Sequence, residues 1–176
     1  QHRARAGLGG VGHLKLDRLL VWLKPQFIGD AVMAMPILDG LIADGRKPIV
    51  YASPLIQDVL GDRRQNVEFT DGKKLSGIGP VLNEAKRLRA MNLDAVILIN
   101  RSFRSALAAR LARIPIRVGH QTEGRGFLLS HKLRYDPAKN EAECYLDLSR
   151  LLGLSYPWIP PKIAVSPDEA VAGLNW

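Results

Sequence analysis

The sequence predicts an α/β protein with an open, mainly parallel sheet and helices on both faces. Short apolar segments alternate along the chain with segments in which apolar residues recur at helical spacing. The apolar segments 18–24 and 93–100 are continuous, which is typical of parallel strands that are covered on both faces. Right-handed crossovers would place every strand-to-helix turn at one edge of the sheet, the carboxyl edge, where ligands bind.

The first crossover starts with the strand expected at 18–24 and turns through Gly29 and Asp30 into a helix expected at 31–43. The apolar residues of this helix form two adjacent rows: Met33, Ile37 and Leu41, and Ala34, Leu38 and Ile42. The next elements are a strand, a short helix, a polar loop and a weak strand, at 48–52, 53–60, 61–66 and 67–70.

The second half opens with a loop at 71–80, rich in glycine and lysine, and a basic amphipathic helix at 81–91. The strand at 93–100 then runs into Ser102, which can cap the helix that follows. Short strands are expected at 114–120 and 132–135, before a helix at 140–152. The buried side of that last helix should consist of Ala142, Tyr145, Leu146, Leu148, Ser149 and Leu152.

Charge and composition restrict the classes of partner. The net charge of +8 favours anionic partners, which are nucleic acid, an anionic membrane surface or a phosphorylated substrate. Aromatic residues make up only 6% and are not interleaved with cations, so nucleic acid is the least favoured. The single cysteine, Cys144, excludes an internal disulfide and makes a cysteine-based metal cluster implausible.

Four cations in the loops expected at 61–66 and 71–80 allow two interpretations. They could face an anionic ligand, but the usual position of a short charge run is on a solvated surface, which we favour. These residues are Arg63, Arg64, Lys73 and Lys74.

Asp30 also allows two interpretations. As an N-cap, its carboxylate would accept hydrogen bonds from the first turn of the helix, which is the more common use of such a residue. As a general base at a cleft edge, it would remove a proton from a substrate hydroxyl. The two interpretations are compatible, and the sequence alone favours the N-cap.

Three motifs resemble those of one enzyme family. Gly29-Asp30, followed after five residues by Pro36, is similar to the start of the family 9 glycosyltransferases, the bacterial lipopolysaccharide heptosyltransferases. The stretch 100–107 resembles the N-x-S-F-[KR]-S-A-L sequence of the heptose-to-heptose type, heptosyltransferase II. The stretch 114–120 is similar to a short family strand that contains Arg and Gly.

The resemblance implies a Rossmann-like domain, the amino-terminal half of a two-domain (GT-B) glycosyltransferase. The implied reaction moves heptose from ADP-heptose to the inner core of lipopolysaccharide with inversion. Asp30 would be the general base, and Lys24, Ser102, Arg104 and Arg125 would bind an anionic lipid A core. The sequence has no Asp-x-Asp pair and no histidine cluster, so we expect no metal, and no cofactor is expected. The resemblance implies that the donor would bind mainly to a second domain, so this chain alone would be inactive.

Two positions depart from the family pattern. His120 stands where the family often has an aromatic residue, and we interpret it as a structural or wall residue. Cys144 stands at the arginine of a Glu-Arg-Tyr motif, of which Glu143 and Tyr145 remain. An anion contact or ion pair of the family is therefore expected to be missing or to be supplied by another arginine.

The expected domain organisation has three parts. Residues 1–17 would be a flexible extension or a remnant of expression, 18–156 the acceptor-binding domain, and 157–176 a linker and the start of a donor-binding domain. The resemblance implies a cytoplasmic enzyme with peripheral contact to the anionic inner membrane. The alternative function is a non-catalytic anion- or sugar-binding domain without a donor site, and the oligomeric state stays open.

Overall fold

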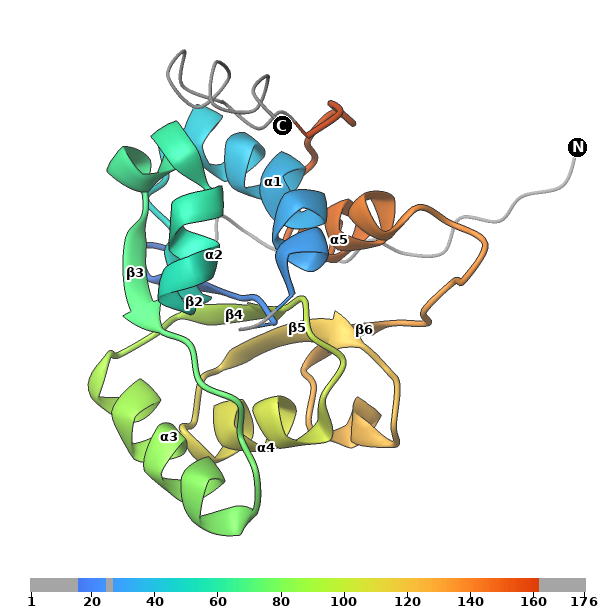
Figure 1. Ribbon diagram of the computed structural model, residues 1–176. Coiled ribbons are helices and arrows are strands. Elements are labelled where there is room, and N and C mark those ends of the chain that lie inside the picture. The colour runs from blue at the N-terminus through green and yellow to red at the C-terminus, as the bar shows by residue number, and fades with distance from the viewer. Residues whose placement is uncertain (1–15, 25–26, 162–176) are drawn as a thin grey trace, which may run out of the picture.

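The computed structural model of the protein describes residues 16–24 and 27–161, and its centre is a six-stranded sheet (Figure 1). Every pair of neighbouring strands is parallel, in the order β3-β2-β1-β4-β5-β6 that Rossmann-like folds share. The predicted parallel α/β fold is therefore confirmed. The strands are β1 (Leu19–Trp22), β2 (Ile49–Ala52), β3 (Glu68–Asp71), β4 (Ala95–Leu98), β5 (Ile116–His120) and β6 (His131–Leu133).

Helices cover both faces of this sheet (Figure 1). On one face lie α1 (Ile28–Ala43), α2 (Pro54–Val59) and α5 (Glu141–Arg150), and on the other α3 (Ile78–Ala90) and α4 (Phe103–Leu111). Two 3₁₀ helices, η1 (Gly61–Asn66) and η2 (Arg125–Phe127), lie in the connections.

The side chains of β1 alternate between two hydrophobic cores because successive residues of a strand point to opposite faces. Leu19 and Val21 pack in the core under α1 and α5, whereas Leu20 and Trp22 pack in the core under α3 and α4. Both β1 and β4 are buried along their full length, which explains why their sequences are continuously apolar. The predicted buried side of α5 is confirmed at each of its six positions.

Local differences from the expected elements are small, and one bears on the site. Helix α1 begins at Ile28 with Phe27 as its N-cap, so Asp30 lies inside the first turn and is not the N-cap. The loop expected at 61–66 forms η1. The last strand, β6, lies one residue earlier than predicted and ends at Leu133.

The described residues contain part of each terminal segment. Of 1–17 the structure describes only Leu16 and Asp17, and Leu16 is buried in the core. Of 157–176 it describes 157–161, which form no helix or strand. The other residues of both segments lie outside the described part. Within the described residues, no helix has the length and apolar character needed to cross a bilayer.

Candidate active site

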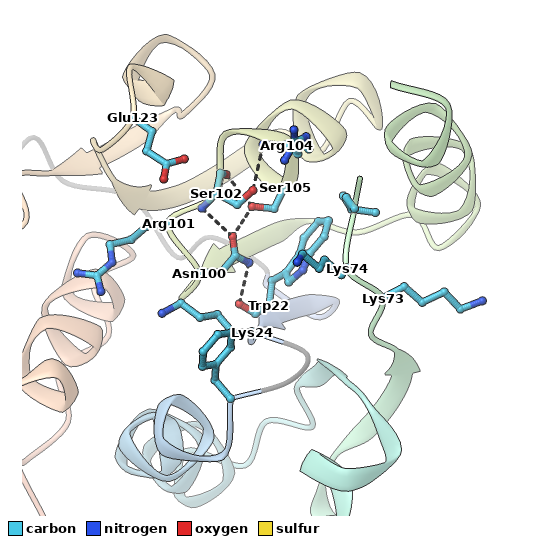
Figure 2. Close-up of a pocket in the computed structure, with 12 residues that line it drawn as sticks. Trp22, Lys24, Lys73, Lys74, Asn100, Arg101, Ser102, Arg104, Ser105 and Glu123 are labelled. Atoms are coloured by element: carbon cyan, nitrogen blue, oxygen red, sulfur yellow. Dashed lines mark hydrogen bonds between the residues drawn. The ribbon is translucent and has the colours of Figure 1, made fainter. Parts of the chain in front are cut away.

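A pocket of about 420 Å³ opens at the carboxyl edge of the sheet, between the ends of β1 and β4 (Figure 2). The chain leaves β1 towards β2 and later returns to its other side at β4, so this is the topological switch point, the usual ligand position in such sheets. The pocket is lined by Trp22, Lys24, Phe27, Lys73, Lys74, Leu75, Asn100, Arg101, Ser102, Arg104, Ser105 and Glu123.

The buried side chain of Asn100 fixes the floor of the pocket (Figure 2). Its amide nitrogen donates to the carbonyl of Trp22 at 3.3 Å, which ties the end of β4 to the end of β1. Its amide oxygen accepts from the backbone of Ser102 at 3.3 Å and from the hydroxyl of Ser105. The start of α4 is therefore fixed relative to both central strands.

Ser102 caps α4 as the sequence predicts, because its hydroxyl accepts from the backbone N–H of Arg104 at 3.2 Å. Both Ser102 and Arg104 line the pocket. The carboxylate of Glu123, on the loop after β5, accepts from the backbone of Phe103 at 3.3 Å. The first N–H groups of α4 therefore have protein partners, and a ligand would meet side chains here rather than a bare helix terminus.

Asp30 and Lys24 form an ion pair beside the pocket. The ammonium group of Lys24 lies 3.2 Å from one carboxylate oxygen of Asp30 and 3.1 Å from the other. The hydroxyl of Tyr145, on α5, donates to the first of these oxygens at 2.9 Å. The Asp30 side chain keeps 14% of its surface exposed and that of Lys24 keeps 27%. Lys24 lines the pocket, whereas Asp30 is not among the lining residues.

The cations after β3 divide into two groups. Lys73 and Lys74 line the pocket, and the backbone N–H of Lys73 donates to the hydroxyl of Tyr51 at 3.1 Å. Tyr51 in turn stacks on Trp22, with ring centroids 4.5 Å apart, and its burial raises the pKa of its hydroxyl. Both lysines are exposed, so the interpretation as a solvated surface agrees with the structure, and the same exposed segment also forms part of the pocket wall.

Arg63 and Arg64, by contrast, pair with carboxylates outside the pocket. Arg63 contacts both carboxylate oxygens of Asp39 on α1, at 2.6 and 2.8 Å. Arg64 contacts Asp58 at 2.9 Å. The interpretation as solvated surface residues therefore agrees with the structure for Arg64, whereas the side chain of Arg63 keeps only 15% of its surface exposed.

Arg101 lies on the side of the pocket next to α5. Its guanidinium group lies 4.1 Å from the ring centroid of Tyr135 and 3.1 Å from the carboxylate of Glu141. Burial acts to raise the pKa of Glu141, but the hydrogen bond from Tyr135 and the charge of Arg101 outweigh it and lower the pKa. Arg101 therefore supplies a cation to α5, the helix that contains Cys144.

Arg125 has a different position from the one expected. It is completely buried and does not line the pocket. Its guanidinium group donates to the carbonyls of His120 and Asn100 at 2.8 Å and of Ser102 at 3.1 Å. Burial and nearby Arg101 lower the pKa of Arg125 to about 10, so it is charged at neutral pH. It supports the pocket wall from behind, by tying together β4, β5 and the start of α4.

His120 and Cys144 are both buried. The imidazole of His120 lies edge-on to the ring of Tyr135, with centroids 5.6 Å apart, which agrees with its interpretation as a wall residue. The thiol of Cys144 contacts the carbonyl of Asp136 at 3.6 Å, and its burial raises the thiol pKa. A long cationic side chain at position 144 would point into the core of this protein.

The lining of the pocket is strongly cationic. Five of its residues are lysine or arginine, and Glu123 is its one acidic residue. Apolar side chains, Trp22, Phe27 and Leu75, form the rest of the wall with small polar groups. Such a pocket can bind an anionic ligand with an apolar or sugar-like face, and Lys24 of its wall is paired with the carboxylate of Asp30.

The fold and this site define a Rossmann-like α/β domain with a basic ligand pocket at its switch point. The chain belongs to glycosyltransferase family 9, because the model of that family, described as glycosyltransferase family 9 (heptosyltransferase), matches residues 81–174. No curated protein sequence matches the chain at a significant level.

Solved structures of this family are similar to the chain. E. coli ADP-heptose lps heptosyltransferase II superimposes with a TM-score of 0.71 at 25% identity, over 90% of this chain and 50% of that one. A family 9 glycosyl transferase from Veillonella parvula DSM 2008 gives 0.67 at 18% identity, over 88% and 47%. E. coli heptosyltransferase WaaC with ADP gives 0.62 at 21%, over 84% and 51%. The chain thus spans about half the length of these proteins.

Proposed function

We propose that this chain is the acceptor-binding, amino-terminal half of an inverting GT-B glycosyltransferase that moves heptose from ADP-heptose to the inner core of lipopolysaccharide. Family membership and the likeness to heptosyltransferase II support this class of reaction. Because the chain spans half of such proteins, the donor would bind mainly to a second domain. Residues 18–156 would form the acceptor domain, 157–176 would lead into the second domain, and this half alone would be inactive.

The observation that carries the proposal is the carboxylate of Asp30 beside a basic pocket at the switch point. Asp30 would accept the proton of an acceptor hydroxyl while that oxygen attacks the anomeric carbon of the heptose. The bond between that carbon and the ADP oxygen breaks on the opposite side, and ADP leaves with the bonding electrons. Attack from the side opposite the leaving group inverts the configuration.

The cations of the pocket suit an anionic lipid A core. Lys24 and Arg104 would hold its carboxylates or phosphates through charge-assisted hydrogen bonds, and Ser102 would contact a hydroxyl. Lys73 and Lys74 extend the same wall and join this set. Arg125 would act by holding the wall in place, since its side chain is buried behind it.

A peripheral position at the anionic cytoplasmic leaflet is part of the proposal. The acceptor is a lipid, and the net charge of +8 favours a negatively charged surface. The protein would then meet its acceptor where that lipid resides.

Replacing Asp30 by Asn in the complete protein tests the role of the base. We expect transfer from ADP-heptose to truncated lipid A cores to fall by about 10²–10⁴-fold, the usual contribution of a general base. The control is Asp39→Asn, which alters a carboxylate on the same helix that pairs with Arg63 away from the pocket. Transfer by Asp30→Asn near the wild-type rate would refute the proposal.

A non-catalytic anion- or sugar-binding domain is the second candidate. The ion pair with Lys24 favours it, because that pair gives Asp30 a structural partner without any reaction. The same assay separates the two functions. Binding of the core without transfer by the complete wild-type protein would favour the second.

A further inference from the structure

The hydroxyl of Tyr145, a residue that does not line the pocket, contacts the carboxylate of the proposed base. We propose that Tyr145 is a positioning residue that holds the Asp30 carboxylate in its reactive orientation while Lys24 turns to the acceptor. This inference rests on the proposed function, because it assumes that Asp30 is the base. It assigns a role to a residue of α5 that is 115 positions away from Asp30 in the sequence.

The two partners of the Asp30 carboxylate differ in what else they can contact. Lys24 lines the pocket, so an anionic acceptor group can compete with Asp30 for its ammonium group. Tyr145 does not line the pocket and is only 2% exposed, so an acceptor cannot take its hydroxyl. An acceptor can therefore compete with Asp30 for Lys24 but not for Tyr145.

Packing of α5 against α1 makes the contact with Tyr145 durable. The two helices lie side by side on one face of the sheet (Figure 1). Tyr145 belongs to the same buried cluster as Ala34 and Leu38 of α1. Burial, followed by the charge of Asp30, raises the pKa of the Tyr145 hydroxyl, so it stays a hydrogen-bond donor to the carboxylate.

The geometry divides the two carboxylate oxygens between two tasks. The oxygen Oδ1 accepts from Tyr145 at 2.9 Å and lies 3.2 Å from the ammonium group of Lys24, whereas Oδ2 contacts Lys24 at 3.1 Å. When an acceptor anion takes Lys24, Oδ2 becomes available for the proton of the acceptor hydroxyl, and Oδ1 stays bound. A carboxylate held in this way does not need to find its orientation anew in the ternary complex, which favours reaction.

The test compares Tyr145→Phe with Tyr156→Phe in the complete protein. Both variants lose one phenolic hydroxyl, and both rings pack on the face that carries α1, but Tyr156 lies at Gly40, away from the pocket. We expect Tyr145→Phe to lower kcat by about 10- to 100-fold with the KM for the acceptor unchanged, because misplacement of a reacting group affects the transition state. Tyr156→Phe should keep the wild-type kcat.

Other outcomes overturn the inference. An unchanged kcat in Tyr145→Phe does so, and so does a loss of kcat accompanied by a matching rise in KM and a lower melting temperature, which indicates a structural role. Transfer by Asp30→Asn near the wild-type rate would refute the proposed function itself, which distinguishes that outcome from a failure of the inference about Tyr145.

Discussion

His120 is a buried histidine in the wall behind the pocket, and its environment disfavours protonation. It is 2% exposed, and burial together with the charges of Arg125 and Arg101 lowers its pKa from 6.5 to about 4. The carboxylates of Glu141 and Asp147 act in the opposite direction but do not compensate. The folded protein therefore holds a neutral imidazole at physiological pH.

This neutral histidine predicts a loss of stability in acid. Between pH 6.5 and about 4 the unfolded chain binds a proton that the folded chain does not, so stability falls as the pH decreases through this window. The shift corresponds to about 3 kcal/mol in the free energy of unfolding. Urea denaturation at neutral pH and at the lower end of the window should show a smaller difference for His120→Gln than for the wild type. The matched control, His131→Gln, changes a histidine of the edge strand β6. An equal acid loss in His120→Gln and wild type would contradict the prediction.

Single residues of the site were predictable only where their partners are local. The cap at Ser102 depends on an N–H group two residues away, so the capping preference was sufficient. Asn100 bonds to Trp22 across 78 residues, and nothing in either local sequence indicates this. For the same reason the interpretation of Asp30 as an N-cap was wrong: partners outside the helix, above all Tyr145, take its carboxylate.

At the scale of elements, apolar patterns, proline and capping signals and the family resemblance indicated the strands and α-helices, but boundaries and loops depended on tertiary contacts. The segment after β3 forms no regular structure, as expected, yet Tyr51 fixes its backbone at Lys73 and so builds a wall of the pocket. The residues after α5 likewise pack on α1, where the ring of Tyr156 covers Gly40. Neither contact has a periodic signal, since each joins an irregular segment to one residue of a distant element.

The contact at Gly40 predicts a site that is sensitive to one methyl group. A Cβ added there would lie 2.2 Å from the ring of Tyr156, so the segment after α5 would have to move. We expect Gly40→Ala to lower the free energy of unfolding by about 1–3 kcal/mol, as overpacking does. Gly79→Ala, in α3, is the matched control: no atom lies within 4 Å of the added Cβ, so alanine should be neutral or slightly stabilising. Equal stability of both variants in thermal denaturation would show that the segment is not firmly packed.

On the scale of the whole molecule, exposed apolar side chains lie where the strand-to-helix connections begin, at the carboxyl edge of the sheet. Phe27, Leu55 and Ile78 lie just before or at the start of α1, α2 and α3, and each is more than half exposed. Phe127 is 73% exposed, and its ring lies 6.1 Å from that of Phe103 at the start of α4. In a parallel sheet all these starts share one edge, which here also carries the cationic pocket. Composition predicted the charge, but only the topology brings apolar and cationic groups to the same edge.

This edge is the part of the molecule suited to an anionic bilayer, because apolar side chains can enter the interface while cations contact headgroups. We expect the complete protein to bind vesicles that contain phosphatidylglycerol in preference to phosphatidylcholine vesicles, in a sedimentation assay. Binding should weaken near 1 M salt, where the screening length falls to about 3 Å. Replacing Lys73 and Lys74 by Gln should weaken it at low salt, since each cation near the surface contributes about 1 kcal/mol. The charge-matched control replaces Lys47 and Arg113, which lie before β2 and β5 at the opposite edge. Equal loss of binding in both double variants would mean that net charge, and not this edge, governs binding. Binding that is independent of salt concentration and lipid charge would refute the electrostatic part of the prediction.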